Sequence, residues 1–160
     1  MKVALAFVLL LFAAGSVAAQ PVYIDQLMEM PQDQLLQTFP GLKREGCYRI
    51  AENRFVLIAM DKKDRKPWRV AIAAGDVCRR SEDAVIDVRH RKGIDLGDTT
   101  IAIMEKMGRP DASAAPEDKQ KKLGEIEYFY ICRLEESCAR HTSVFIRDGI
   151  VTAISEWYSE

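Results

Sequence analysis

The chain has 160 residues, 48% of them hydrophobic and 29% charged, and its formal net charge is −1. This composition is typical of a folded protein and argues against a disordered or low-complexity chain. The near-neutral charge also argues against a strongly basic nucleic-acid-binding protein. We therefore expect one compact domain or two very small ones, with no nucleic acid as partner.

The first nineteen residues have the pattern of an export signal. Lys2 provides a positive start, residues 3–14 carry no charge, and small side chains end the segment at Ala19. We expect cleavage after Ala19 and a mature chain that is periplasmic or secreted. An uncleaved anchor is the weaker alternative, because the apolar run falls short of the about 20 residues needed to span a bilayer. No membrane span is expected in the mature form.

The rest of the chain contains an even number of cysteines, namely Cys47, Cys78, Cys132 and Cys138. In an exported protein this favours two disulfides, and of the three possible pairings we favour Cys47–Cys78 and Cys132–Cys138. The spacings do not match those of a zinc site, so we expect neither a metal nor a cofactor.

Hydrophobic spacing predicts two groups of elements. Residues 23–39 form two short helices or one kinked helix, and a second helical segment begins at Asp98 or Thr99 and ends at Gly108. Residues 111–122 form a polar loop. The β-rich segments, of which residues 84–89 are the least regular, are residues 47–50, 54–60, 68–73, 84–89, 125–133, 141–147 and 150–158.

The two halves run in the same order, with a helical region, a proline-containing stop and three strands. We therefore predict an α+β fold of two tandem helix-pair-plus-antiparallel-sheet repeats. The expected boundaries are a signal peptide at residues 1–19, an N-terminal repeat at 20–82 and a C-terminal repeat at 83–160. The alternative is one α+β domain whose halves are alike by chance.

The C-terminal half carries a recognisable order of short motifs. These are Gly93-Ile94, Gly97-Asp98-Thr99, Met107-Gly108-Arg109-Pro110-Asp111, Tyr128-Phe129-Tyr130 and the Asp148-Gly149 turn. Together they resemble the SmpA/OmlA (BamE-like) domain over about residues 93–155, with Met107 where that family usually has Leu. The doubled, disulfide-linked order of elements is also similar to that of beta-lactamase inhibitor protein.

These resemblances imply a small module of helices packed on a sheet that binds other proteins. BamE-like proteins work at the outer-membrane assembly machinery, usually as lipoproteins. This chain differs from them because no cysteine lies near Ala19 to carry a lipid.

The Asp148-Gly149 turn predicts the register of the last hairpin, with Phe145 opposite Thr152 and Val144 opposite Ala153. Alternation then places Val144, Ile146, Val151 and Ala153 on the core face. The opposite face carries Phe145, Ile150, Thr152 and Ile154, and Trp157 and Tyr158 extend it. Either this second face binds a protein partner, or the other repeat or a loop covers it.

A second, weaker candidate is a basic loop. It contains Lys62, Lys63, Arg65, Lys66 and Arg69, opposed by Asp61 and Asp64. Such a loop is either a solvated turn or a docking point for an acidic partner or anionic lipid.

The sequence contains none of the common catalytic motifs. Glu125 and Glu127 share a strand face, which is typical of the solvent side of a strand, and His141 has no obvious nucleophile beside it. We therefore expect no catalytic residue and a non-catalytic protein-binding module for envelope assembly or maintenance, whose partner is another envelope or exported protein. The alternatives are an inhibitor or immunity protein against an exported hydrolase and, third, a small envelope enzyme.

Overall fold

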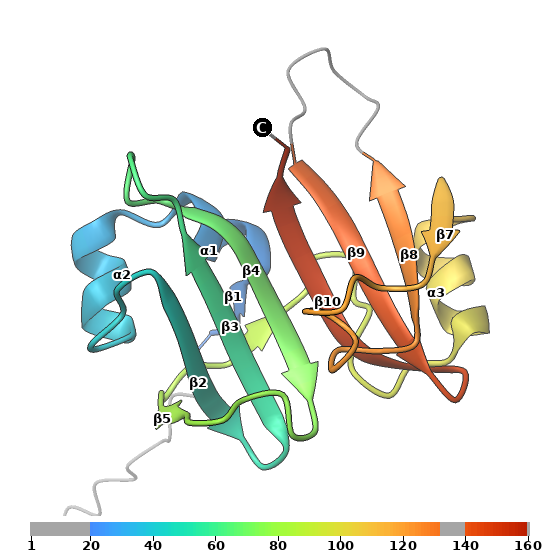
Figure 1. The fold of residues 1–160 in the computed structure, drawn as a ribbon, viewed down its shortest axis with the longest axis horizontal. Coiled ribbons are helices and arrows are strands. Elements are labelled where there is room, and N and C mark those ends of the chain that lie inside the picture. The colour runs from blue at the N-terminus through green and yellow to red at the C-terminus, as the bar shows by residue number, and fades with distance from the viewer. Residues whose placement is uncertain (1–19, 132–139, 160) are drawn as a thin grey trace, which may run out of the picture.

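The computed structural model describes residues 20–131 and 140–159. Its main feature is an eight-stranded sheet with the strand order β5-β2-β3-β4-β10-β9-β8-β7 (Figure 1). The strands of this sheet are β2 (Glu45–Ala51), β3 (Arg54–Met60), β4 (Pro67–Ala74), β5 (Glu82–Asp83), β7 (Ala112–Ala114), β8 (Ile126–Ile131), β9 (Arg140–Arg147) and β10 (Ile150–Tyr158). A separate parallel pair joins β1 (Val22–Tyr23) to β6 (Val88–Arg89).

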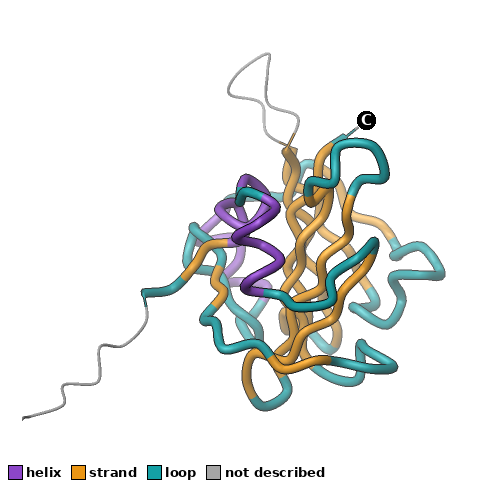
Figure 2. Tube along the Cα trace, turned by 90° about the vertical axis from the view of Figure 1, so that its left-hand side faces the viewer, coloured by secondary structure: helices purple, strands orange, loops and turns teal. Residues whose placement is uncertain are grey.

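The described helices are α1 (Ile24–Glu29), α2 (Gln32–Thr38) and α3 (Thr100–Met107). They lie on one side of the strands, as the edge-on view shows (Figure 2). Buried side chains of the helices, including Leu27, Leu35 and Ile103, pack with Ile72 and Val144 of the sheet in one core. The predicted α+β class is therefore confirmed.

Six of the eight strands form two antiparallel meanders, and β5 and β7 are short strands at the two edges of the sheet. Strands β2, β3 and β4 form the N-terminal meander, and β8, β9 and β10 form the C-terminal meander. Antiparallel pairing of β4 with β10 joins them, with Ala73 opposite Ala153 and Ala71 opposite Ser155. The small side chains at this junction leave room for other groups to pack on the sheet. One sheet therefore spans both of the repeats that were expected to meet between residues 82 and 83.

Two elements show how local chemistry fixes the chain. The Thr99 hydroxyl accepts the backbone N–H of Ala102 (3.2 Å) and so caps α3 at one of the two residues expected. Asp148 and Gly149 both have positive φ (52° and 76°), as the predicted two-residue hairpin turn requires.

The strands predicted at residues 54–60 and 150–158 are confirmed to the residue. The strand predicted at residues 84–89 is wrong, because two short strands, β5 and β6, flank a segment without regular structure. Strand β7 lies inside residues 111–122, which had been expected to form a loop.

The register of the last hairpin departs from the prediction at a β-bulge. Val151 pairs with Ile146 as expected, but Phe145 pairs with Ala153 because Thr152 is the extra residue. The bulge reverses alternation beyond it, so that Ile154 faces the helices and Ala153 faces away from them. The predicted faces are therefore wrong for these two residues.

Candidate functional site

The face of the sheet opposite the helices, here called the open face, is partly covered by residues 115–124, the covering loop. Figure 1 shows this loop crossing in front of β9 and β10. Leu123 of the loop is 4% exposed and packs with Phe145, Ala73 and Ala153. Gly124 lies so close to β9 that a Cβ there would approach the backbone nitrogen of Ile146 to 2.9 Å. The loop backbone therefore rests directly on the strand.

Hydrogen bonds fasten the covering loop to both meanders. Lys122 Nζ donates to the carbonyl of Val77 (2.5 Å), and Thr152 Oγ1 donates to the carbonyl of Leu123 (2.5 Å). The bulged residue Thr152 therefore serves to hold the loop.

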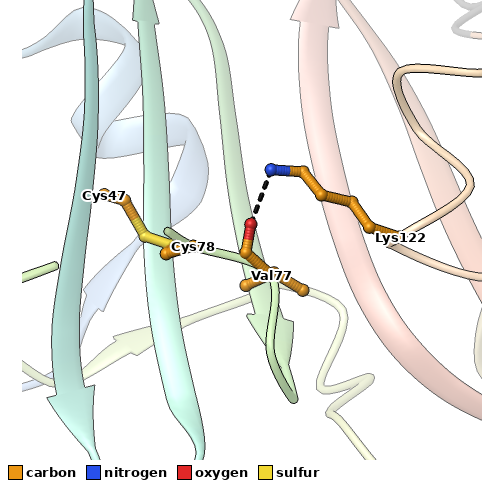
Figure 3. The surroundings of a disulfide bond; sticks show 4 residues. All are labelled: Cys47, Val77, Cys78 and Lys122. Carbon is orange, nitrogen blue, oxygen red and sulfur yellow. Dashed lines mark hydrogen bonds between the residues drawn. A yellow bond between two sulfur atoms is a disulfide. The ribbon is translucent and has the colours of Figure 1, made fainter. Parts of the chain in front are cut away.

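The Cys47–Cys78 disulfide lies beside Val77, the residue that Lys122 contacts (Figure 3). This disulfide confirms the first predicted pairing. The predicted partners Cys132 and Cys138 lie outside the described residues.

The six residues predicted to form a protein-binding face do not share one open face. Phe145 lies on the open side but is fully buried under the covering loop, and Ile154 is fully buried in the helix-side core. Tyr158 also packs on the helix side, where its hydroxyl donates to Glu29. Ile150 and Trp157 remain partly exposed. The structure thus realises the alternative in which a loop covers Phe145.

A buried polar group lies on the open face around Arg69. Arg69 Nε donates to Ser155 Oγ (2.8 Å), and its guanidinium carbon lies 5.8 Å from the centre of the Phe145 ring. When its amide is oriented to satisfy both neighbours, Gln120 accepts from Arg69 Nη1 (2.6 Å) and donates to Glu127 (3.2 Å). Arg69 therefore does not belong to the exposed basic loop predicted from the sequence, because its side chain turns inward over the sheet.

Burial governs the electrostatics of this group. Burial lowers the pKa of Arg69, and the nearby Glu127 carboxylate opposes that change. Burial likewise raises the pKa of Glu127, although the Ser143 hydroxyl and Arg69 favour its ionised form. Glu127 is 5% exposed, so it does not lie on the solvent side of its strand. Glu125, by contrast, is exposed and forms an ion pair with Arg147 (3.7 Å).

Four side chains form a cross-strand row along one end of the open face. Arg69 lies opposite Trp157, Trp157 opposite His141, and His141 opposite Ile131. We call these four residues the open-face row. The rings of Trp157 and His141 lie 4.7 Å apart, and Trp157 Nε1 donates to Ser143 Oγ (2.9 Å). Ile131 is 47% exposed, so the row runs from a half-buried cation to an exposed apolar side chain.

The other predicted cations occupy the turn between β3 and β4. Lys62, Lys63, Arg65 and Lys66 are all exposed there. Asp61 organises the turn, because its Oδ1 accepts the backbone N–H groups of Lys63 (2.6 Å) and Asp64 (2.9 Å). These bonds hold the pKa of Asp61 below its usual value.

Sequence reasoning missed a second buried polar group, which lies on the helix side. His90 Nε2 lies 3.3 Å from Glu156 Oε1, and Arg140 Nε lies 3.2 Å from Glu156 Oε2. His90 and Glu156 are 4% and 5% exposed. The reversal of faces at Thr152 directs Glu156 inward, so only knowledge of the bulge would have found it.

Within residues 20–131 and 140–159, no three His, Cys, Asp or Glu side chains are placed to hold a metal ion. In the same residues, no helix is long and apolar enough to cross a membrane.

Comparison with known proteins relates this chain to others through its fold alone. No family model matches it, and no curated protein matches it. Its fold is similar to that of a DUF4309 family protein, YjgB, from Bacillus subtilis subsp. subtilis str. 168. The TM-score is 0.51 at 12% sequence identity, over 85% of this chain and 93% of that one. The chain thus shares an α+β fold with YjgB, and identity this low carries no function across.

Proposed function

We propose that this chain is an exported, non-catalytic protein-binding module of the cell envelope, which binds its partner through the open-face row. One observation carries the proposal. Arg69, Trp157, His141 and Ile131 form a continuous, partly exposed strip on the sheet face opposite the described helices. Tryptophan and arginine are the side chains that most often dominate the energy of protein interfaces.

The row is also held in place before any partner arrives. Trp157 is fixed by its bond to Ser143 and by the His141 ring, and Arg69 is fixed by Ser155. Side chains that are already ordered lose less conformational entropy on binding, which favours affinity. The covering loop closes the neighbouring region around Phe145, so a partner meets the row rather than the centre of the face.

Export and a periplasmic or secreted location belong to the same proposal. The pattern of residues 1–19 supports them, and the Cys47–Cys78 disulfide is the kind of bond that persists in an oxidising compartment.

We further propose that residues 20–82 and 83–160 are tandem repeats of a BamE-like unit. The two meanders have the same strand order along the chain, with α1 and α2 before the first. One described helix, α3, precedes the second meander, rather than the expected pair. Motif residues also have structural roles that suit the resemblance, since Thr99 caps α3 and Gly108 ends it with φ at 83°.

The test is a pull-down from native envelope extract with the mature chain and two variants, Ile131→Asp and Ile101→Asp. Ile131 lies in the row, whereas Ile101 is 69% exposed on α3 and serves as the matched control. We expect a protein retained by the wild-type chain and by Ile101→Asp but lost with Ile131→Asp, with all three baits folded by circular dichroism. Equal retention by both variants, or no specific protein with any bait, would overturn the proposal.

The identity of the captured protein separates the classes. An outer-membrane assembly component supports the envelope role. A soluble hydrolase whose activity falls on addition of one equivalent of this chain would instead support the inhibitor alternative. An activity of the chain itself that disappears in a folded Glu127→Gln variant would make it an enzyme and end the non-catalytic proposal.

A further inference from the structure

One end of the molecule carries a concentration of cations that the near-neutral total charge conceals. The exposed cations are Lys43, Arg44, Lys62, Lys63, Arg65 and Lys66, and the exposed or half-exposed carboxylates among them are Glu45, Asp61 and Asp64. The backbone bond from Met60 to the carbonyl of Arg44 (2.7 Å) brings the two segments side by side. Among the described residues, none of the six cations lies within ion-pair distance of a carboxylate, so their charges face solvent.

The turn that carries four of these cations is fixed in shape. Asp61 Oδ1 accepts two backbone N–H groups of the turn, and the N–H of Asp61 donates to the carbonyl of Lys66 (2.8 Å). Arg65 has a positive φ of 53°, which closes the turn. Figure 1 shows the turn between β3 and β4 projecting beyond the ends of its strands. A fixed projection presents its charges outward together.

A bulge places a tryptophan beside this turn. Ala59 pairs with Arg69 and Met60 pairs with Pro67, so Trp68 is the extra residue between them. Bulges redirect side chains, and Trp68 is 41% exposed although it lies in a central strand. An exposed indole next to unpaired lysines and arginines is the combination that favours the interface between water and lipid headgroups.

We propose that this end of the molecule, the basic turn with Lys43, Arg44 and Trp68, docks onto an anionic phospholipid bilayer. The shape favours a bilayer over an acidic protein groove, because a projecting turn reaches a flat surface without needing a complementary cavity. The charges attract the headgroups, and Trp68 inserts at headgroup depth. This docking does not depend on the open-face row.

The test measures binding of residues 20–160, which include every described element, to vesicles. Equal parts of phosphatidylglycerol and phosphatidylcholine provide an anionic surface, and phosphatidylcholine alone provides a neutral one. Each cation near an anionic membrane contributes about five-fold to binding, so Lys62→Glu/Lys66→Glu should weaken co-sedimentation by about 25-fold or more. Lys92→Glu/Lys119→Glu changes the net charge equally at exposed sites outside the patch and should change binding little.

Fluorescence tests the tryptophan separately. The chain has two tryptophans, so a Trp157→Phe background leaves Trp68 as the reporter. We expect its emission to shift to the blue with anionic vesicles, and the shift to weaken as salt screens the charges. The Trp157→Phe substitution itself should leave vesicle binding intact, even if it weakens capture of the protein partner. This difference separates the membrane proposal from the proposal for the open-face row.

Three results would overturn the proposal. These are no binding to anionic vesicles at low salt, equal losses from both double variants, and no shift in Trp68 emission on binding. Capture of polyglutamate without vesicle binding would also overturn it, and would assign the patch to acidic proteins.

Discussion

Replacing Phe145 with alanine tests whether the covering loop is an integral part of the fold. Phe145 is fully buried between β9 and the loop, where it packs with Leu123 and Val77. Its removal leaves a space on the sheet that the strand neighbours Ala73 and Ala153 cannot fill, because they have only methyl groups. The cost should therefore lie near the full value for a buried aromatic side chain.

The magnitude follows from three contributions. Burying the ring contributes about 1.5–3 kcal/mol, and the contact with the Arg69 guanidinium adds about 0.5–1 kcal/mol. The unfilled cavity supplies the rest, so Phe145→Ala should lower the free energy of unfolding by about 4 kcal/mol, within the usual range of about 3–5 for such substitutions. Because Phe145 is not exposed, the same variant should still capture the protein partner under conditions in which the variant is folded.

Urea unfolding followed by circular dichroism, with the disulfide kept oxidised, measures this loss. Ile150→Ala is the matched control, because Ile150 lies on the same side of the same hairpin but is 42% exposed. It should cost less than about 1 kcal/mol. A loss below about 1 kcal/mol for Phe145→Ala would refute the packing of the covering loop on the sheet.

Three other predictions concern covalent and ionisable groups. The Cys47–Cys78 link spans a sequence separation of 31, so replacing both cysteines with serine should cost about 3–4 kcal/mol in urea unfolding, and an unchanged midpoint would contradict this. Burial raises the pKa of Glu127 above 4.5, so its carboxyl group stays protonated to a higher pH in the native state than in the unfolded chain. The wild type should therefore lose stability relative to Glu127→Gln as the pH rises from about 4.5 through the raised pKa, and a slope of opposite sign would disprove the assignment. Burial and the hydrogen bond to the Glu29 carboxylate raise the pKa of Tyr158 to about 12. In an ultraviolet titration, the difference between the wild type and Tyr158→Phe should therefore be an absorbance step near pH 12, and a step near pH 10 would contradict this.

The sequence was sufficient for features that depend on local patterns. The strands at residues 54–60 and 150–158, the cap at Thr99 and the Asp148-Gly149 turn all follow from period, propensity and turn chemistry. The cysteine count and the expected compartment predicted two disulfides and left three pairings open, and the favoured pairing Cys47–Cys78 is present. Each of these signals lies in neighbouring residues or in a count, so no tertiary information was needed.

The register beyond Thr152 could not be predicted, because the bulged residue makes its contact with a distant part of the chain. The Thr152 hydroxyl donates to the carbonyl of Leu123, a residue of the covering loop 29 positions away. Alternation alone gives no sign of such an anchor, and one extra residue exchanges the two faces. Ile154 and Glu156 consequently face the helices.

The sequence-based prediction of the candidate site failed for a related reason. Arg69 follows a run of exposed cations, and Glu127 alternates with apolar residues, so both have the pattern of solvent-facing side chains. Glu127 is instead buried and Arg69 half-buried, because the covering loop brings Gln120 into contact with both. A loop without periodicity leaves no sequence signal of the face on which it packs.

The covering loop leaves the open-face row uncovered at the same end of the sheet as the basic turn. It fills the part of the open face around Phe145, where a partner would have to displace a packed core. Trp157 and Ile131 lie on the open face beyond the loop. Trp68 and the basic turn lie next to them, because Trp68 precedes Arg69 in the chain and Arg69 pairs with Trp157. If both proposals hold, a partner bound at Trp157 would sit close to the membrane surface. Protein capture should then be stronger on anionic vesicles than in solution, and Lys62→Glu/Lys66→Glu should remove that gain while leaving capture in solution unchanged.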